Sequence, residues 1–494
     1  PPRLRRPSAR RPGRGHPSPA GRRLALALGL CAGGRRALGQ YNGTAKIETT
    51  MLYGSVNEYA YYFAELYVGA PEPQKVSVIV DTGSSLCAFP CEGCAHCGDH
   101  MDVPFDMEAS QSARFLPCGS QCAGTCLEGR CGYAQSYTEG SSIAGLWFQD
   151  QVRLGDVDER NPAVNATLGC HTDERNLFYT QRVNGIMGMA PHENGGWPTI
   201  LQDLFVDKEH VSAGIFALCL SEWGGRLTVG GHDPSVHAPG REIQWIQLQH
   251  SGYYSVALSS LSIGGAVVGS GSAAFGAALV DSGTTFSYFP REVHARMLSA
   301  IEGFCGGDGG CAARRVPGEE GCWRLDNGAT EPAGFPALAM RFDDRPLRGA
   351  PASAAAAGPE VEWPPRAYLF QRGDPSLWCY AFASNGPDDS TVLGISWMLH
   401  KDIIFDLVHS RLGVVEAACP RYSRPGSDGF GPFGALALDD ASARPLAVKV
   451  LNVLWIVCSI GAVAGLGWFA YVNWCGSEKG VLYHSPEDEL EGGE

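Results

Sequence analysis

An internal repeat is the feature that most constrains what this chain can fold into. Residues 81–85 read D-T-G-S-S and follow the apolar run 78–80, while residues 281–285 read D-S-G-T-T and follow the apolar run 278–280. One such triplet is weak evidence for a functional site, because the same residues occur in ordinary turns. Two triplets, each behind a strand-like apolar run, are a strong signal.

The spacing of the repeat predicts the architecture. A second apolar element that ends in glycine follows each triplet. Gly188 follows Asp81 at nearly the same interval along the chain as Gly394 follows Asp281. Two paired signatures with similar spacing predict two homologous lobes that pack about a pseudo-twofold axis.

The triplets predict a pair of facing carboxylates. A buried strand delivers each aspartate to the end of a rigid element, and Gly83 or Gly283 lets the backbone turn sharply beside it. If the lobes pack about a twofold axis, Asp81 and Asp281 face each other. Two such carboxylates do not readily ionise together, so they share a proton.

A shared-proton pair predicts hydrolysis of peptide bonds. One aspartate acts as a general base on a water molecule, while the other donates a proton to the carbonyl oxygen of the scissile bond. This chemistry needs neither a metal ion nor another cofactor, so we expect none.

Composition agrees with a protein of several domains that is mostly β. The chain has 494 residues, 44% of them hydrophobic, with 64 Gly and 32 Pro. This length suggests two or three domains, and the glycine and proline content favours strands joined by turns. The segments predicted as strands include Tyr61–Val68, Val76–Val80, Arg226–Val229, Tyr253–Leu258 and Ile403–Phe405.

The charge distribution argues against a nucleic-acid partner. The formal net charge is −14, although residues 1–40 contain ten Arg and no acidic residue. The rest of the chain is therefore strongly acidic, which suits basic ligands better than nucleic acid.

The segment 1–40 predicts a secretory leader. Arg22 and Arg23 precede a short apolar stretch at 24–34, as in a signal peptide. A disordered basic arm is the alternative. Two N-x-[ST] acceptors, at Asn42 and Asn165, agree with secretion and are predicted glycosylation sites.

The end of the chain predicts a membrane anchor. The apolar run 450–472 contains no charged residue, and it is long enough to span a bilayer as a helix. A buried core helix is the alternative. With the leader, this predicts a single-pass type I protein of the secretory pathway, with a linker or stalk at 426–449 and a short cytosolic tail at 473–494.

Cysteine usage also indicates an oxidising compartment. The chain has 18 Cys, and 15 of them lie between the leader and the apolar run. The odd number leaves at least one thiol free or bonded to another molecule. Eight of them fall within 87–131, where they predict either four disulfides or a zinc knuckle that uses His96 and His100.

The residues from about 58 to 420 resemble the pepsin-like aspartic peptidases. Besides the triplets, the similarity rests on the segments 61–63, 69–71, 227–231 and 391–413. The resemblance implies a mostly β, bilobal fold with lobes at 41–235 and 236–425. It also implies supporting roles for the hydroxyls beside the aspartates, which either cross-brace the two loops or bond the carboxylates: Thr82, Ser84, Ser282 and Thr284.

The same resemblance implies a flap that closes over the substrate. Tyr137 matches the flap tyrosine of the family, and Gly140 lies in the turn that follows it. A flap excludes water and so strengthens polar interactions at the carboxylates. Many pepsins have a Trp shortly after the first triplet, where this chain has Leu86 to Pro90. Phe89 can only pack there.

The insert at 87–131 resembles that of nepenthesin-type peptidases and, in more detail, of the plasmepsin V-like export peptidases of apicomplexans. That resemblance implies cleavage after an Arg-x-Leu motif in export proteins. Glu139 on the flap then pairs with the arginine, with Gln181 as a second contact. It also implies residence in the endoplasmic reticulum or Golgi. A solvated charge at the flap tip is the alternative role for Glu139.

Two other functions remain open. The first is a less selective secretory peptidase, either a sheddase or a degradative enzyme. The second is a catalytically silent binding protein, although such proteins usually lose an aspartate or a glycine that this chain keeps. For any of the peptidase readings we expect polypeptide substrates, a membrane-embedded C-terminal helix and a monomer.

Overall fold

The computed structural model describes residues 46–119, 122, 124–155, 163–191, 197–206, 211–250, 252–307, 310–343, 358–386 and 390–422. Within them no helix is both long enough and apolar enough to cross a bilayer. The predicted leader, Asn42, stalk, membrane span and tail lie outside these residues, so they stay predictions.

The described part of the chain is mostly β, as predicted. Its largest sheet has 15 strands, and 14 of them follow one another in the order β13-β29-β28-β11-β12-β1-β2-β3-β10-β4-β9-β8-β7-β6, with β5 paired to β8. Their bounds are β1 (Glu48–Ser55), β2 (Tyr61–Val68), β3 (Gln74–Asp81), β4 (Cys87–Pro90), β5 (Arg114–Phe115), β6 (Cys126–Leu127), β7 (Arg130–Ser136), β8 (Ser142–Leu154), β9 (Val164–Arg175), β10 (Gly185–Gly188), β11 (Ile215–Leu220), β12 (Gly225–Val229), β13 (Gln244–Gln247), β28 (Lys401–Asp406) and β29 (Arg411–Glu416).

Three smaller sheets come from the second half. A six-stranded sheet comprises β14 (Gln249–His250), β15 (Tyr254–Val256), β18 (Ala278–Val280), β27 (Thr391–Leu393), β19 (Ser287–Phe289) and β26 (Phe382–Ser384). A four-stranded sheet comprises β17 (Ala266–Ser270), β16 (Leu258–Ile263), β22 (Leu338–Phe342) and β23 (Glu360–Trp363). Another comprises β20 (Ala313–Arg315), β21 (Cys322–Leu325), β25 (Leu377–Tyr380) and β24 (Leu369–Gln371).

Among the described residues, helices are few and mostly short. They are α1 (Leu177–Thr180), α2 (Ile200–Val206), α3 (Arg291–Cys305), α4 (Pro365–Tyr368) and α5 (Ile395–Met398), with 3₁₀ turns at Pro234–Val236 and Ser272–Ala274. The longest, α3, buries Val293, Met297 and Ile301. These residues are four positions apart and therefore share one face of the helix.

The internal repeat recurs in the strand pairing. The strand before the first triplet, β3, pairs in parallel with β10, which places Gly188 beside Asp81. The strand before the second triplet, β18, pairs in parallel with β27, which ends one residue before Gly394. Both glycines touch the backbone of their triplet loop so closely that a Cβ atom would clash with it. The repeat therefore builds the same local structure twice.

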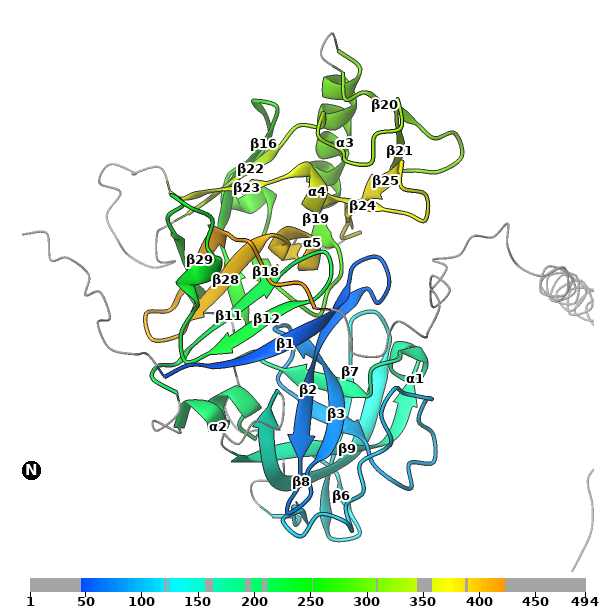
Figure 1. Cartoon of the computed structure of the whole chain (residues 1–494), viewed down its shortest axis with the longest axis vertical. Coiled ribbons are helices and arrows are strands. Elements are labelled where there is room, and N and C mark those ends of the chain that lie inside the picture. The colour runs from blue at the N-terminus through cyan, green and yellow to red at the C-terminus, as the bar shows by residue number, and fades with distance from the viewer. Residues whose placement is uncertain are drawn as a thin grey trace, which may run out of the picture. The chain divides into compact units, whose positions relative to one another are not determined.

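The strands β11, β12, β28 and β29 join the two halves, and Figure 1 shows them between β1 and the second-half sheets. The ring of Phe216 in β11 stacks on Phe405 in β28, with centroids 4.4 Å apart. The hydroxyl of Tyr254 in β15 donates to the carbonyl of Met189 at 2.7 Å. One sheet thus crosses the predicted boundary at 235/236, and the exact lobe limits stay a prediction.

The strand predictions agree with the structure, with one correction. The predicted strand Tyr61–Val68 is β2, residue for residue. The segment predicted as one strand at Tyr253–Leu258 instead divides into β15 and the start of β16. The reason is tertiary, because β15 pairs with β14 and β18, whereas β16 pairs with β17 and β22.

Seven disulfides account for 14 of the 15 cysteines in the described part. They are Cys91–Cys170, Cys94–Cys97, Cys118–Cys126, Cys122–Cys131, Cys219–Cys419, Cys305–Cys311 and Cys322–Cys379. The zinc knuckle is therefore wrong. Four disulfides within the insert are also wrong, because Cys91 bonds outward to β9 and Cys87 is a free, buried thiol.

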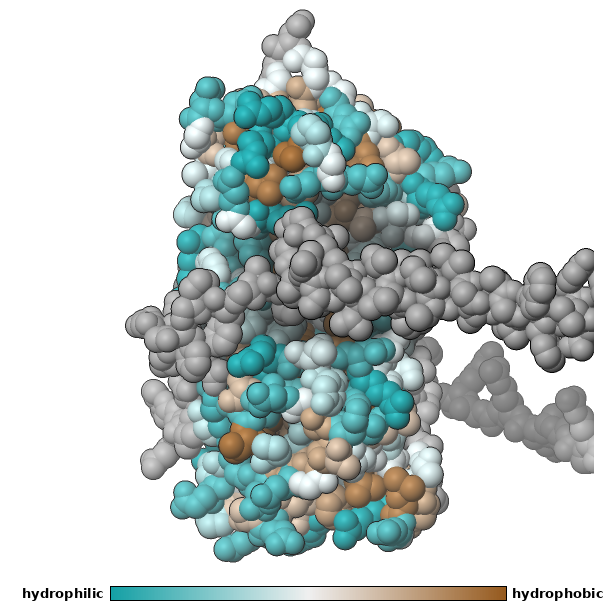
Figure 2. All heavy atoms as spheres, turned by 90° about the vertical axis from the view of Figure 1, so that its right-hand side faces the viewer, coloured by the Kyte–Doolittle hydropathy of each residue, from teal (hydrophilic) through white to brown (hydrophobic). Residues whose placement is uncertain are grey.

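The surface of the described residues carries no dominant hydrophobic area on the face shown in Figure 2. Hydrophilic residues cover most of it, and hydrophobic residues form small separate groups. The most exposed large apolar side chains, Val103, Val206 and Val267, come from distant segments. Scattered apolar residues are normal on a protein surface and need no explanation. The predicted monomer stays a prediction.

Candidate active site

Asp81 and Asp281 lie at the ends of two central strands. In β3 every residue from Val76 to Asp81 is buried, and the strand is paired on both sides by β2 and β10. Asp281 directly follows β18, which is flanked by β15 and β27. Because central strands are held on both edges, each carboxylate is delivered from a rigid position.

The two glycines of the triplets allow the carboxylates to approach each other. A Cβ atom at Gly83 would lie 2.6 Å from Oδ1 of Asp281, and one at Gly283 would clash with Asp81. Each glycine N–H also donates to Oδ1 of the aspartate in its own loop at 2.8 Å. Any larger residue at either position would push the aspartates apart.

The hydroxyls expected to support the aspartates do so symmetrically. The Ser84 hydroxyl donates to Oδ2 of Asp81, and the Thr284 hydroxyl donates to Oδ2 of Asp281. Each carboxylate thus has one oxygen held by a backbone N–H and the other by a hydroxyl. Thr82 and Ser282 bond the two loops to each other through four hydrogen bonds, with donor–acceptor distances of 2.7 to 3.0 Å.

Burial and proximity keep a proton on this pair. Asp81 and Asp281 are 5% and 9% exposed. Burial, then the negative charge of Asp281, raises the pKa of Asp81 to about 8, although bonds from Ser84 and Gly83 act in the opposite direction. A raised pKa on one member is what a buried pair with one shared proton requires. The arrangement can activate a water with one carboxylate and protonate a carbonyl with the other.

Tyr137 closes over the pair from the β7–β8 hairpin. Its hydroxyl is buried, and the pKa of Tyr137 is raised by this burial and next by the negative charge of Asp81. Its ring packs on Phe178 with centroids 5.0 Å apart. Tyr137 thus lies near Asp81 and packs on Phe178, and its role as the flap tyrosine stays a prediction.

Phe89, which occupies the region of the Trp found in many pepsins, faces the core. Its ring makes edge contacts with Phe105 and Phe148, with centroids 5.8 and 6.0 Å away. It is fully buried in the β-sheet core, so it does not help to hold the flap.

The residues predicted to select substrate differ in their exposure. Glu139 is exposed at the tip of the hairpin, beside Gly140, whose φ of 90° makes the turn. Gln181 is 9% exposed, and its side-chain amide donates to the carbonyl of Val183 at 3.0 Å. Glu139 is thus open to a ligand, while Gln181 already makes a local bond. Both substrate roles stay predictions.

The predicted glycosylation acceptor Asn165 is accessible. It lies in β9, opposite Gln151 of β8, and its side chain is exposed between two buried neighbours. The alternation of exposed and buried residues is that of a strand with one solvated face. Modification of Asn165 stays a prediction.

Residues behind the flap were missed by the sequence analysis. The segment from Glu174 to Gln181 contacts both the flap tip and the cysteine-rich insert, through Asn176, Phe178 and the buried side chain of Glu174. The sequence signal for this segment was weak. Acidic and histidine residues at 171–174 followed by a short apolar stretch are also typical of a loop.

Two clusters of metal-ligand side chains occur among the described residues, and both lie apart from the aspartates. In one, Cys322 and Cys379 are already joined in a disulfide. In the other, the rings of His232 and His237 are parallel within 8°, 5.3 Å apart, and Asp402 bonds His237 at 2.9 Å. Lone pairs of imidazole lie in the ring plane, so stacked rings do not converge on one ion.

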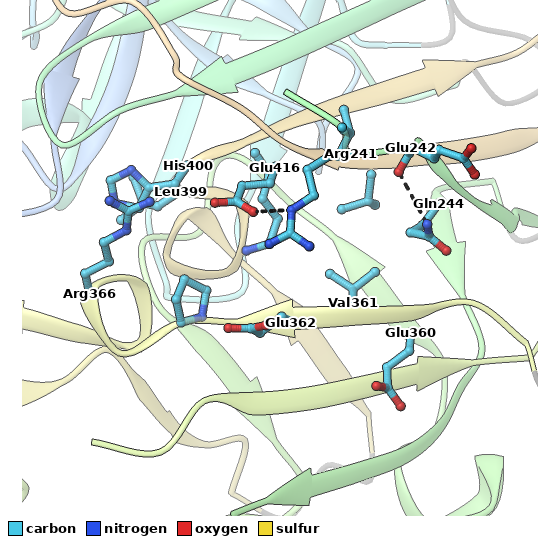
Figure 3. A pocket seen from close by; sticks show the side chains of 15 residues that line it. Arg241, Glu242, Gln244, Glu360, Val361, Glu362, Arg366, Leu399, His400 and Glu416 are labelled. Atoms are coloured by element: carbon cyan, nitrogen blue, oxygen red, sulfur yellow. Dashed lines mark hydrogen bonds and ion pairs between the residues drawn. The ribbon is translucent and has the colours of Figure 1, made fainter. Parts of the chain in front are cut away.

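A separate cavity of about 540 Å³ lies between β13, β29 and β23. Figure 3 shows Arg241 paired with Glu416 on one side of the cavity, while Glu362 lies on the opposite side and is not joined to Arg241. At its wall, burial lowers the pKa of Lys401 to about 7, and the Lys401 ammonium donates to the carbonyl of Trp397 at 2.9 Å. Its charges are of both signs and partly paired, so its lining does not favour one class of ligand.

The comparisons with known proteins agree with this geometry. Residues 61–417 match the family described as eukaryotic aspartyl protease. The chain belongs to this family. The predicted pepsin-like aspartic peptidase, an endopeptidase of the hydrolase class, is thereby confirmed at the level of the family.

Individual relatives of this aspartyl protease include proteins of parasites and of a plant. It is 32% identical to Aspartic protease 5 of Toxoplasma gondii over 449 residues, covering 79% of this chain and 40% of that protein. It is 26% identical to Plasmepsin V of Plasmodium falciparum, covering 75% of this chain and 73% of the relative. Nepenthesin-2 of Nepenthes gracilis is 28% identical to this chain, and the match covers 49% of this chain and 55% of nepenthesin-2. The predicted resemblance to these groups is confirmed, and the chain spans less than half the length of Aspartic protease 5.

Proposed function

We propose that this aspartyl protease is a membrane-anchored endopeptidase that matures exported or secreted proteins by cutting after an Arg-x-Leu-type motif. The observation that carries the peptidase activity is the symmetric pair of Asp81 and Asp281. In this proposal a water bound between them is activated by the ionised carboxylate, and the protonated one donates to the carbonyl oxygen of the substrate.

The flap supports the proposed selectivity. Glu139 is an exposed carboxylate within two residues of Tyr137, and its negative charge acts on that tyrosine. A substrate arginine beneath the flap would form a charge-assisted and bidentate contact with it. The chain is similar to Plasmepsin V, and the resemblance to export peptidases implies an Arg-x-Leu motif, so this similarity favours the same interpretation.

The disulfides support a lumenal location. Seven disulfides in the described part suit an oxidising compartment, where the secretory leader and the anchor at 450–472 would hold the protease. The endoplasmic reticulum and the Golgi fit equally well.

The cut sites of the purified chain in a random peptide library test the proposal. Substrates with Arg→Lys or Leu→Ile replacements should be cut more slowly, and Glu139→Gln should raise KM for arginine substrates while leaving KM for substrates without arginine unchanged. Equal cleavage of all these peptides would favour the alternative, a less selective sheddase or degradative peptidase. No cleavage of any peptide would favour a silent binding protein.

A further inference from the structure

The flap tip rests on the segment at 176–178. The side-chain amide of Asn176 donates to the carbonyl of Gly140 at 2.7 Å, and the N–H of Leu177 donates to the hydroxyl of Ser141 at 3.2 Å. The ring of Tyr137 packs on Phe178. The position of Tyr137 over the aspartates therefore depends on the position of this segment.

The same segment is bonded on its other side to the cysteine-rich insert. The N–H of Glu174 donates to the carbonyl of His96 at 2.8 Å, and the N–H of Gly98 donates to the Glu174 carboxylate at 3.0 Å. A Cβ atom at Gly98 would clash with the backbone of Tyr179, so only glycine allows this approach. The disulfide Cys94–Cys97 closes the loop that makes these contacts.

The Glu174 carboxylate is the buried centre of the junction. Its side chain is fully buried, and it also accepts bonds from His171 at 2.7 Å and from His100 at 2.9 Å. Burial alone would raise the pKa of Glu174, but the bonds from His100 and His171 outweigh this effect and lower the pKa to about 2. The carboxylate is therefore an anion held by three donors, which is a strong and directional contact.

His100 connects this carboxylate to the end of α1. Its Nδ1 lies 3.1 Å from the carbonyl oxygen of Gln181, and its Nε2 lies 2.9 Å from Glu174. A carbonyl can only accept, so Nδ1 carries a proton. A second proton lies between Nε2 and the carboxylate. His100 thus links the carboxylate to the end of α1 through both of its ring nitrogens.

The described groups around the junction of His100 and Glu174 are buried or paired. His171 of β9 and Tyr133 of β7 are buried beside Glu174, and His96 and Asp173 pair at 3.4 Å on the outer side. Burial lowers the pKa of His171, although the hydrogen bond to Glu174 acts in the opposite direction. His100 is the group that joins the Glu174 carboxylate to the end of α1.

We propose that the cysteine-rich insert is a brace for the flap and that His100 is its positioning residue. The brace fixes the segment 174–181, and this segment in turn holds the flap tip over the aspartates. The inference rests on the proposed peptidase activity and not on its selectivity.

Hydrogen–deuterium exchange on the full chain tests the brace without any substrate. In His100→Ala, the flap tip at 137–141 should exchange several times faster than in the unchanged protein, while β16, β22 and β23 should exchange at the same rate. Glu174→Gln should give the same pattern. Asp99→Asn is the matched control, because Asp99 is exposed on the same loop.

Kinetics provide the second readout. With active enzyme counted by a tight-binding inhibitor, His100→Ala should lower kcat/KM by about tenfold or more, since a misplaced active-site group costs this much. Asp99→Asn, the matched control, should leave kcat/KM unchanged.

Unchanged exchange at the flap tip in both variants would overturn the brace, even if activity fell. A general increase in exchange over all sheets would overturn it as well, since His100 would then serve only stability. If the unchanged protein cut no peptide, the proposed function would fail while the exchange experiment still decided on the brace.

Discussion

Thr82 and Ser282 bond each other's loops reciprocally. The N–H of each donates to the hydroxyl of the other, at 3.0 and 2.9 Å, and each hydroxyl donates to the carbonyl that precedes the opposite aspartate, at 2.8 and 2.7 Å. Four buried hydrogen bonds thus join two triplets that are 200 residues apart in the chain. They hold the two proposed catalytic loops in one position.

Thr82→Val should destabilise the protein. It keeps the shape of the side chain but leaves the N–H of Ser282 and the carbonyl of Val280 buried without these partners, at about 1–3 kcal/mol for each group. Thermal unfolding should show a Tm several degrees lower. Thr172→Val is the control, since that hydroxyl is exposed on β9 and bonds only at 3.3 Å. Equal Tm values for the two variants would contradict a structural role for the reciprocal bonds.

Asp281→Asn should remove activity without unfolding the protein. An amide of the same shape still accepts from the N–H of Gly283, but it neither ionises nor shares a proton. We expect kcat to fall by about 10²–10⁴-fold, the usual contribution of a general acid or base. Peptide cleavage at saturating substrate measures this loss, with Asp99→Asn as the control. Full activity in Asp281→Asn would remove the two aspartates from the mechanism.

As pH rises, the unchanged protein should lose stability relative to the variant Asp81→Asn. The pKa of Asp81 is raised to about 8, while an unfolded chain has an aspartate pKa of about 4. The folded protein therefore binds this proton more tightly, and its stabilising effect is lost as pH rises from about 4 to 8. The Tm of Asp81→Asn minus that of the unchanged protein should grow over this interval. A constant difference would contradict the raised pKa.

Cys87 should resist alkylation in the folded state. The thiol is buried, and burial raises the pKa of Cys87 to about 12, so little reactive thiolate forms near neutral pH. Treatment with iodoacetamide before and after unfolding without reductant, followed by peptide mapping, should label Cys87 only after unfolding. Labelling of Cys91 or Cys170 under the same conditions would instead show that their disulfide is not formed.

Much of the fold and of the central site follows from the sequence. The strands β2 and β3 are rich in apolar and β-branched residues, and the two triplets behind β3 and β18 repeat at a spacing that implies two lobes. These are local signals, since a strand's burial pattern and a glycine turn depend on neighbouring residues. For this reason the family and the candidate residues Asp81, Asp281 and Tyr137 can be predicted from the sequence.

Only the tertiary structure decided which distant groups meet. The pairing of Cys91 with Cys170, the burial of free Cys87 and the contact of His100 with Glu174 all depend on segments that lie far apart in the chain. Cysteine count limits the number of disulfides but not their partners. His100 and Glu174 are ordinary polar residues until folding removes the water around them. Burial then makes each depend on the other, and sequence alone does not report burial of that kind.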